Sequence, residues 1–471
     1  MEAIRRATCS VALLCAFLLV SQGAAQAQVY ASRVSMGGDA WLNVTNHGVL
    51  GNNFTTRSPS FEYPGGSGHE HLTHAGLWLG ARATDDAGSF TGVVTGSFDQ
   101  FLGTSTASLT EFSPLGNTVA FRSSDPTSFA YSPLALSDDE TLASFDDHVA
   151  KTAASGAEIN RPMGITVRQV THSWASSAYR HFVITRYIVT SQSAHPIEDL
   201  WIGFYSELSS GNKNNYVSWP PSGSWFRKKF LEWDPAWRML REHYCANAPV
   251  PSGCNFQLLP EWAGIQLLTP PGANRQLTLA AWNYAPGDAT RDEDVERYAL
   301  MTAGTLANLA DPLLQPGTGD PTELLAIGPF QLPSYGDSVE VAFAFVGGAD
   351  IPSLQRHARS AQALADHGYD LAVVDVPPQG TGTRIAISPS INPTSAGGIE
   401  FVIELPSPGE AMVELLDLAG RRVAHEILGS LSAGTHRVAF TPRAGLAPGV
   451  YLVRFLHASG TAGTRVVRLE R

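Results

Sequence analysis

The stretch "YRHFVITRYIVT" (residues 179–190) places β-branched and aromatic side chains on both faces of a predicted strand. A strand that is apolar on both sides lies between two layers. "VEVAFAFVGG" (339–348) has the same character, and "ITVRQVTHSW" (165–174) and "QLTLAAWNYA" (276–285) are expected beside these two strands. Gly and Pro separate the short apolar runs, as is typical of strands joined by turns. The pattern predicts a mainly all-β protein whose body, residues 28–376, is a large antiparallel β-sandwich.

One helix is predicted directly after residues 339–348. Asp350 is a suitable N-cap, and Pro352 lies in the first turn, where a missing N–H leaves no hydrogen bond unmade. Gly368 occupies the position that follows a helix C-terminus. The apolar side chains between them recur at helical spacing: Leu354, Ala358, Ala361 and Ala365. We expect this helix to pack across the sandwich or to close one end.

The N-terminus has the features of a secretory signal peptide. Arg5 and Arg6 precede the apolar run "VALLCAFLLV", and Ala25-Gln26-Ala27 fits an A-x-A cleavage site. The run is too short to span a membrane. We therefore interpret residues 1–27 as a signal peptide and expect no transmembrane segment after its removal.

Charge and cysteine content fit an exported protein. The formal net charge of -12 argues against nucleic acid as a partner, because such proteins need a basic surface. Of the 4 Cys, Cys9 and Cys15 lie in the signal peptide. Cys245 and Cys254 flank the loop "ANAPVPSG", and in an oxidising compartment they are expected to form a structural disulfide.

A second domain is predicted at the C-terminus. "VPPQGTG" (376–382) reads as a turn-rich linker, which we place at 377–384. Short strands then follow one another between Gly and Pro turns. In the strand near 449–455, Tyr451, Val453 and Phe455 alternate with Val450, Leu452 and Arg454. This spacing predicts a small immunoglobulin-like β-sandwich over residues 385–471.

The C-terminal segment also resembles a known family. Its landmarks in order are "INP" (391–393), "ELP" (404–406), "LLDLAGRRV" (415–423), "SAGTHRV" (432–438) and "LAPGVYLVR" (446–454). These resemble the type A C-terminal sorting domain of type IX secretion cargo, and are similar to the immunoglobulin-like domain of flagellar hook-capping proteins. The residues that carry the pattern are Asn392, Pro393, Gly420, Gly434, Gly449 and Tyr451. The late Lys of the family is absent, and Arg465, Arg468 and Arg471 stand in its place.

The resemblance implies an export route. In that family the type IX secretion machinery at the outer membrane recognises the domain, and a sortase-like peptidase often removes it. The cargo is then secreted or attached to the cell surface. The alternative is an immunoglobulin-like module with a purely structural role. The body resembles large uncharacterised surface proteins that carry such domains, and this brings no activity with it.

The stretch "HEHLTHAGLWLGA" (69–81) raises the question of a metal site. Three histidines suffice for a catalytic zinc. However, the HExxH order is absent, and a strand would place His69 and His71 on one face and His74 on the other. We expect a polar strand start that leads into a buried strand, with metal binding by His69, His71 and His74 as the open alternative.

A second candidate site is acidic. "SDDETLASFDD" (137–147) contains Asp138, Asp139, Asp146 and Asp147, and carboxylates gathered in a loop suit calcium. The EF-hand spacing is absent. Such a calcium ion would be structural, and the alternative is a solvated acidic loop. No other cofactor is expected.

A third candidate site is aromatic. Seven of the ten Trp lie between residues 201 and 282, and exposed rings of this kind stack on sugars. The alternative is that the rings fill the core. We single out four residues as candidates for binding a cell-surface polysaccharide: Trp219, Trp225, Trp233 and Trp237.

Catalysis is the least supported possibility. Glu232, Asp234 and Glu261 lie among these aromatic residues, and glycoside hydrolysis needs two carboxyl groups about 5 to 9 Å apart. No nucleophile elbow, P-loop or dinucleotide fingerprint is present. We expect an exported, non-catalytic surface or secreted protein, with a carbohydrate-binding protein and a secreted glycoside hydrolase as alternatives.

Overall fold

The computed structural model is mainly β-structure. It describes residues 29–99, 110–148, 161–216, 218–221, 223–226, 229–244, 259–285, 293–304, 320–369, 371, 386–389, 399–405, 409–418, 420–431, 434–440, 447–457 and 460–468. The predicted signal peptide, the linker at 377–384, Cys245, Cys254, Asn392 and Pro393 lie outside these residues.

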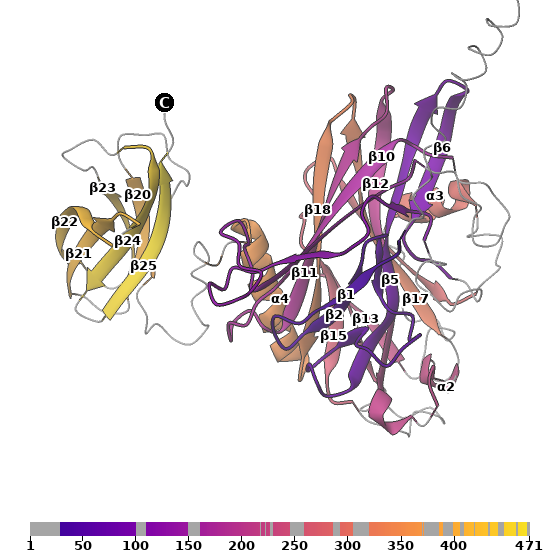
Figure 1. The fold of residues 1–471 in the computed structure, drawn as a ribbon, viewed down its shortest axis with the longest axis horizontal. Helices are drawn as coiled ribbons and strands as arrows, with labels where there is room; N and C mark the ends of the chain where they lie inside the picture. The colour runs from indigo at the N-terminus through magenta and orange to yellow at the C-terminus, as the bar shows by residue number, and fades with distance from the viewer. Residues whose placement is uncertain are drawn as a thin grey trace, which may run out of the picture.

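In the residues described, the body has two antiparallel sheets of nine strands each (Figure 1). The first, here called the β5 sheet, has the order β1-β2-β3-β5-β12-β17-β16, with β4 and β6 paired to β5. Its strands are β1 (Ser32–Ser35), β2 (Trp41–Thr45), β3 (Val49–Gly51), β4 (Phe61–Glu62), β5 (His69–Asp85), β6 (Gly88–Thr95), β12 (Ile197–Asn212), β16 (Gln276–Asn283) and β17 (Pro321–Leu332).

The second sheet, here called the β11 sheet, has the order β13-β14-β15-β18-β11-β10-β9-β7, with β8 paired to β9. Its strands are β7 (Ser113–Pro114), β8 (Ala120–Arg122), β9 (Asp139–Asp146), β10 (Ile165–Ser173), β11 (Phe182–Ser191), β13 (Lys229–Asp234), β14 (Met239–Tyr244), β15 (Trp262–Leu267) and β18 (Ser338–Gly348).

The central strands of the β11 sheet are buried on both faces, as their sequence predicts. Val183 and Tyr187 of β11 and Phe343 of β18 face the β5 sheet in the main core. Ile184 and Ala344, one residue further along each strand, belong to a second core on the opposite face. A strand whose side chains are apolar on both faces therefore lies between two layers, as predicted.

Strand partners are less predictable than strand faces. β10 pairs with β11 along its whole length, as expected. The expectation for residues 276–285 was wrong, because β16 is the edge strand of the β5 sheet and pairs with β17. Apolar periodicity identifies the face that a strand buries, but it does not identify its neighbour.

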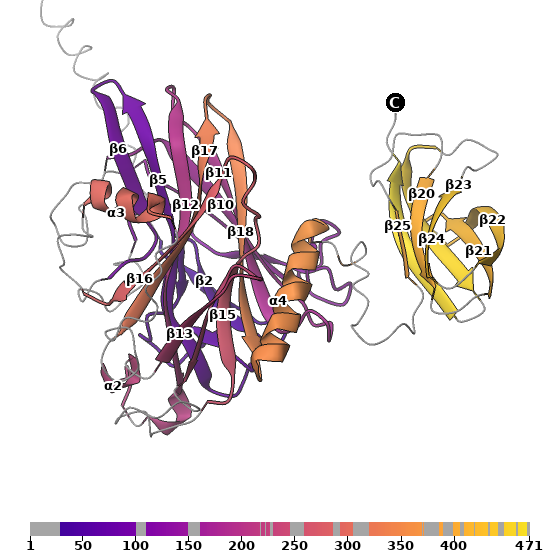
Figure 2. The ribbon, with the colours of Figure 1, turned by 180° about the vertical axis from the view of Figure 1, so that it is seen from behind.

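The described residues of the body also form three helices and one 3-10 turn: η2 (Lys213–Asn215), α2 (Gly223–Phe226), α3 (Asp294–Thr302) and α4 (Ile351–Asp366). α4 covers the outer face of the β11 sheet, where Leu354, Ala358 and Ala361 join the second core. α3 lies on the outer face of the β5 sheet, where Met301 packs near Trp78. The two helices therefore cover opposite outer faces of the sandwich (Figure 2).

The predicted helix is confirmed together with its caps. The Asp350 carboxylate accepts a hydrogen bond from the Ser353 N–H at 2.7 Å, and the Ser353 hydroxyl in turn accepts one from the Asp350 N–H at 2.9 Å. This reciprocal capping box satisfies two N–H groups. Gly368 follows the helix with φ of +72°, a backbone conformation that favours glycine.

Replacing the cap should weaken the helix measurably. We expect Asp350→Ala to lower the free energy of unfolding by about 1 kcal/mol, because the Ser353 N–H loses its acceptor. Urea denaturation followed by tryptophan fluorescence measures this change. Asp366→Ala, at the other end of the same helix, is the matched control and should change stability by less than about 0.5 kcal/mol. Equal effects of the two substitutions would contradict a capping role.

The C-terminal residues form a separate small sandwich, here called the C-terminal module. Its three-stranded sheet has the order β19-β20-β23, and its four-stranded sheet the order β22-β21-β24-β25. The strands are β19 (Ala386–Pro389), β20 (Ile399–Leu405), β21 (Gly409–Leu416), β22 (Arg422–Leu431), β23 (Gly434–Phe440), β24 (Gly449–His457) and β25 (Gly460–Arg468). Phe401, Val413 and Phe455 belong to a core made only of module residues. Seven short strands in two facing sheets match the predicted immunoglobulin-like architecture.

Candidate functional site

The beginning of β5 gathers a group of buried polar contacts. Each polar residue of "HEHLTH" (69–74) except Thr73 has a partner from a different part of the chain. A β-bulge interrupts the strand here, because Leu72 pairs with Leu208 and His74 with Glu207, which leaves Thr73 without a pairing residue. The simple alternation of faces assumed from the sequence therefore fails between His71 and His74.

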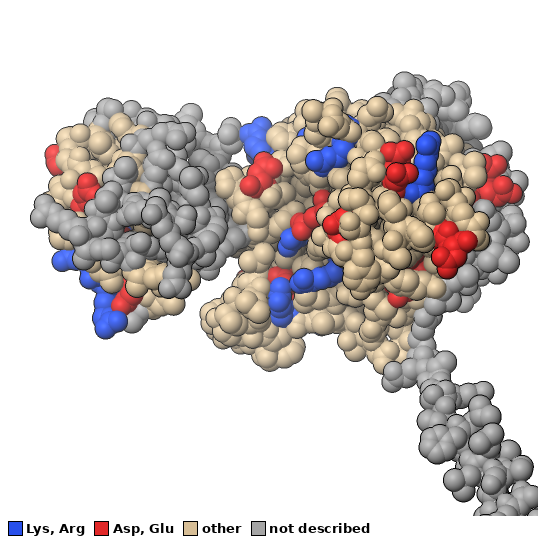
Figure 3. All heavy atoms as spheres, turned by 90° about the horizontal axis from the view of Figure 1, so that it is seen from above, with Lys and Arg blue, Asp and Glu red and all other residues tan. Residues whose placement is uncertain are grey.

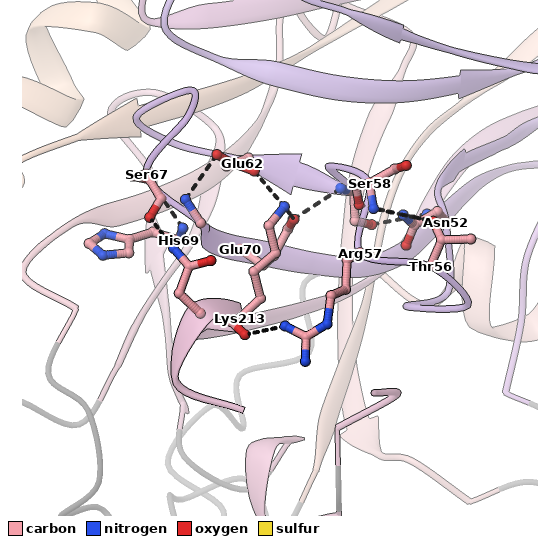
Figure 4. Close-up of polar contacts among 12 residues, drawn as sticks. Asn52, Thr56, Arg57, Ser58, Glu62, Ser67, His69, Glu70 and Lys213 are labelled. Atoms are coloured by element: carbon pink, nitrogen blue, oxygen red, sulfur yellow. Dashed lines mark hydrogen bonds and ion pairs between the residues drawn. The ribbon is translucent and has the colours of Figure 1, made fainter. Parts of the chain in front are cut away.

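Glu70 belongs to a buried charge cluster centred on Lys213 (Figure 4). The Lys213 Nζ donates to Glu62 Oε2 at 2.5 Å and to Glu70 Oε1 at 2.7 Å. The remaining carboxylate oxygens accept backbone N–H groups, from Gly68 to Glu62 and from Ser60 to Glu70. Burial is the largest influence on Glu70 and raises its pKa to about 7, although Lys213 opposes this rise.

Arg57 fixes the backbone of the segment that carries Lys213. Its Nη1 donates to the Lys213 carbonyl at 2.8 Å (Figure 4). Its Nη2 donates to the Tyr216 carbonyl. The loop before β4 and the turn η2 are thus joined at the position where the lysine enters the cluster. Only four lysines occur in the chain, and Lys213 in "SSGNKNN" (209–215) was the one sequence signal for this cluster.

His71 lies in a chain of neutral groups between the two sheets. Its Nε2 is 3.0 Å from the Tyr63 carbonyl and must donate, while its Nδ1 is 2.6 Å from the Ser210 Oγ and must accept. Burial lowers the pKa of His71 to about 4, so the ring is neutral. The Ser210 hydroxyl is therefore committed to His71, and its second hydrogen bond, with Glu242 Oε2, requires a proton on Glu242. Burial raises the pKa of Glu242 to about 7, in agreement with a protonated carboxyl.

The other two histidines have their own partners. His69 Nδ1 lies 3.0 Å from Glu261 Oε2. His74 Nε2 lies 3.1 Å from Glu207 Oε2, and its ring stacks on Tyr205. In the part of the chain that the structure describes, no group of three or more His, Cys, Asp or Glu is arranged to hold a metal ion. The three histidines thus tie β5 to separate neighbours and do not converge on one point.

These buried carboxyls should make the body less stable at alkaline pH. Burial raises the pKa of Glu70 and Glu242 to about 7 and of Glu323 to about 8. A carboxyl of this kind contributes stability that is complete below its pKa in the unfolded chain, which is 4.5 for Glu. This contribution is lost as the pH rises through the pKa of the group in the folded protein. We expect the free energy of unfolding to fall between pH 6.5 and 8.5 by about 2 kcal/mol for Glu323 and by about 0.8 kcal/mol each for Glu70 and Glu242, whose loss is nearly complete by pH 7.

The measurement is a series of urea denaturation curves across this pH range. His71 does not contribute to the change of stability with pH in this range, because its lowered pKa affects stability only below 6.5, the pKa of His in the unfolded chain. Glu323→Gln removes one titrating group and should flatten the curve. A stability that is constant or rises over this range would show that the carboxyls are ionised in the folded protein.

The acidic segment is a strand rather than a loop, so the loop geometry assumed both for a calcium site and for its solvated alternative is not found. Asp139 and Asp146 are the two ends of β9, and at about 3.3 Å per residue they are roughly 20 Å apart. One ion cannot contact both ends. The carboxylates instead accept hydrogen bonds from distant segments: Asp138 from Ala175, Asp139 from Met36, and Asp147 from Met163 and Ile165, while Asp146 pairs with His148.

The four candidate Trp side chains do not share one face. Trp225 is 1% exposed and lies against Gly211, where any side chain would collide with its ring. Trp219 is half-buried and meets Trp225 edge to face at 5.6 Å. Trp233 packs against the main core between the sheets, whereas Trp237 packs against the core under α4. The last two therefore lie on opposite faces of the β11 sheet.

An aromatic stack that the sequence does not reveal lies at the edge of the β11 sheet. The rings of Phe230 and His243 are 5.1 Å apart, and those of His243 and Trp262 are 3.9 Å apart. The three residues come from β13, β14 and β15 and are direct cross-strand partners. The sequence shows the residue types but not which strands pair, so only the register reveals this stack.

The carboxylates considered for hydrolysis are each paired with a base. Arg241 binds Glu232 at 2.8 Å and Asp234 at 3.0 Å, and Glu261 binds His69. Arg241 also lies 5.5 Å from the Trp262 ring centre. The described geometry at this edge is an ion-pair network beside aromatic rings.

The described sorting-motif residues occupy turns and strand starts of the C-terminal module. Gly420 has φ of +76° in the turn between β21 and β22. Gly434 begins β23 and Gly449 begins β24. The Tyr451 hydroxyl donates to the Ala447 carbonyl at 2.8 Å, a contact of the kind found in the tyrosine corner of immunoglobulin-like domains.

Comparison with known proteins identifies no relative by sequence. No protein-family model matches the chain, and no curated protein matches it. Among solved structures, a polysaccharide lyase is similar with a TM-score of 0.25 and 9% identity, over 94% of this chain and 47% of the lyase. A β-glucuronidase of Faecalibacterium prausnitzii gives 0.14 and 11%, over 44% and 37%. A tetra-tandem repeat of a large adhesion protein gives 0.14 and 11%, over 94% and 98%.

These similarities are weak. This chain spans about half the length of the polysaccharide lyase, 47%. All three TM-scores are too low to assign a fold or an activity to this protein. No helix among the described residues is long and apolar enough to cross a membrane.

Proposed function

We propose that this protein is an exported, non-catalytic cell-surface or secreted protein whose C-terminal module directs type IX secretion. The observation that carries the proposal is the independent core of that module, formed by residues such as Phe401, Val413 and Phe455. A sorting signal must be recognised whatever cargo precedes it. A module with its own core can be presented to a secretion machine in the same form on any body.

Two of the motif residues support this proposal through their structural roles. Gly420 occupies a turn with positive φ, which favours glycine. Tyr451 is 9% exposed and ties β24 to the preceding chain through Ala447. The landmarks of the sequence pattern thus coincide with positions that define the module's fold. A structural immunoglobulin-like module would use the same positions, so the test must measure transport.

The non-catalytic part of the proposal rests on the pairing of candidate groups. Glu232 and Asp234 share Arg241, and Glu261 is bonded to His69. Charged side chains of both signs are interspersed on the face of the described residues that Figure 3 shows. This distribution agrees with a solvated surface and gives that face no continuous basic area for nucleic acid.

The test is mass-spectrometric mapping of the protein's termini in separated cell fractions. We expect the cell-surface or medium fraction to begin at Gln28, and the same map shows whether residues 385–471 are retained or removed. A chain truncated before residue 385 should remain in the periplasm, and a reporter that carries 385–471 behind a signal peptide should leave it. An intact periplasmic native protein, or secretion of the truncated chain, would overturn the proposal.

A second candidate function is carbohydrate binding by the aromatic residues of the body. The observation that favours it is the half-buried stack of Phe230, His243 and Trp262 beside the Arg241–Glu232 pair, since rings next to hydrogen-bonding groups suit sugars. A glycan array with the native protein tests it. Binding that Trp262→Ala abolishes and Trp237→Ala retains would support this function, and an array without signal would exclude it for the glycans present.

A further inference from the structure

A second buried lysine, Lys229, has an unusual contact with Asp320. Its Nζ lies 3.1 Å from Asp320 Oδ1, and the Lys229 side chain is 1% exposed. Neither atom nevertheless forms a hydrogen bond of regular geometry with a described residue. Lys213 differs, since it donates two well-formed hydrogen bonds to its carboxylates. The Lys229 amine and the Asp320 carboxyl are thus in contact without being satisfied.

The two residues belong to opposite layers of the sandwich. Lys229 is the first residue of β13, the edge strand of the β11 sheet. Asp320 immediately precedes β17 of the β5 sheet. A bond between them would join the two sheets and close a long segment of chain that contains β14, β15, β16 and α3.

A third buried group, Glu323, interacts electrostatically with Lys229. Its Oε1 accepts hydrogen bonds from the Ser206 hydroxyl at 2.7 Å and the Leu208 N–H at 3.3 Å. Its Oε2 is buried and lacks a hydrogen-bond partner among the described residues. Glu323 is fully buried and interacts electrostatically with Lys229. Burial raises its pKa to about 8, a value suited to taking up and returning a proton near neutrality.

We propose that Lys229 and Asp320 condense to an isopeptide bond, a covalent cross-link between the two sheets that forms within the folded chain. When Glu323 is in its minor ionised form, the Lys229 ammonium transfers one proton to this carboxylate, which leaves a free amine. The amine attacks Cγ of the protonated Asp320 carboxyl and forms the N–C bond. The C–OH bond then breaks as Glu323 returns this proton to the hydroxyl, so that water leaves. The Glu323 carboxylate takes up the second proton that the nitrogen loses, which leaves the amide. No oxidant, nucleotide or metal is consumed.

The electrostatics of the site decide how fast this step runs. Burial lowers the pKa of Lys229, but Asp320, Glu207 and Glu323 together outweigh it, so the pKa lies above its usual value. The free amine is therefore a minor species. Burial raises the pKa of Asp320 to about 7, which supplies the protonated acid that amide formation needs. A single turnover per molecule, with the two atoms held in contact, tolerates such a slow step.

The test is the mass of the native protein under denaturing conditions, after reduction of its cysteines and mapping of its termini. We expect a mass lower than the sequence by one water, and a proteolytic peptide in which Lys229 is joined to Asp320. Lys229→Arg and Asp320→Ala should restore the full mass. Glu323→Gln should do the same while both reacting residues remain. Lys213→Arg, at the satisfied lysine, is the matched control and should retain the loss.

Several outcomes would overturn the proposal. One is a wild-type protein with the full sequence mass, and another is a cross-link mapped to a different pair. Loss of water that persists in Lys229→Arg would do the same. Loss that persists in Glu323→Gln would remove Glu323 from the reaction. The decisive measurement is the mass of the wild-type protein, so the cross-link can still be tested if a variant fails to fold.

Discussion

Phe343→Ala is expected to lower the free energy of unfolding of the body by about 3 to 5 kcal/mol. Phe343 has no exposed surface and lies at the centre of the main core. Its ring is 4.9 Å from Phe204 of the β5 sheet and 6.4 Å from Tyr187 of the neighbouring strand. Truncation removes the apolar contacts and leaves a cavity that the two sheets cannot close, because many other side chains hold them apart.

The measurement can be restricted to the body. All ten Trp lie between residues 41 and 282, so tryptophan fluorescence in urea reports the body and not the C-terminal module. Phe343→Leu keeps most of the volume and should cost less than about 1.5 kcal/mol. Tyr335→Ala, at a side chain that is 70% exposed, should change stability by less than about 0.5 kcal/mol. A small effect of Phe343→Ala would mean that this ring does not support the contact between the sheets.

The strands next to this core show what the sequence can specify. β11 and β18 are predictable because both of their faces are apolar, which identifies a strand between two layers. α4 is predictable because Asp350, Pro352 and Gly368 mark its ends by local chemistry alone. In each case the information lies within a few neighbouring residues.

The acidic segment shows where that reasoning ends. Asp147 is 1% exposed, yet its sequence context resembles a solvated loop. Its carboxylate is satisfied by the N–H groups of Met163 and Ile165, which follow it by 16 and 18 residues. A carboxylate becomes compatible with burial only through such partners. The sequence gives no sign of which backbone groups will supply them.

The candidate site has the same limit. The histidines of β5 were recognisable as a polar strand start, but their partners were not. His69 binds Glu261, 192 residues further along the chain, and the bulge at Thr73 depends on the register with β12. The buried lysines were visible only as two of four in a chain otherwise rich in arginine. Long-range pairing decides which polar residues become a cluster.

Lys213→Met is expected to lower the free energy of unfolding by about 3 to 5 kcal/mol at neutral pH. The substitution keeps an apolar stem of similar length but leaves the Glu62 and Glu70 carboxyls together without their cation. Both side chains are at most 3% exposed, so water cannot replace the ammonium. Urea denaturation followed by tryptophan fluorescence again measures the loss.

The pH dependence of this loss distinguishes missing charge from missing packing. Lys213 holds the pKa of Glu70 below the value that burial alone would give. Without the lysine the pKa of Glu70 should rise further, so the variant is less impaired at pH 5, where Glu70 is protonated, and more impaired at pH 8. Replacing Glu62 and Glu70 by Gln in the Lys213→Met background should recover most of the stability, because the amides need no counter-charge. A loss that is equal at both pH values and persists in the triple variant would assign it to packing of the lysine stem, and the cluster would then not depend on its charges.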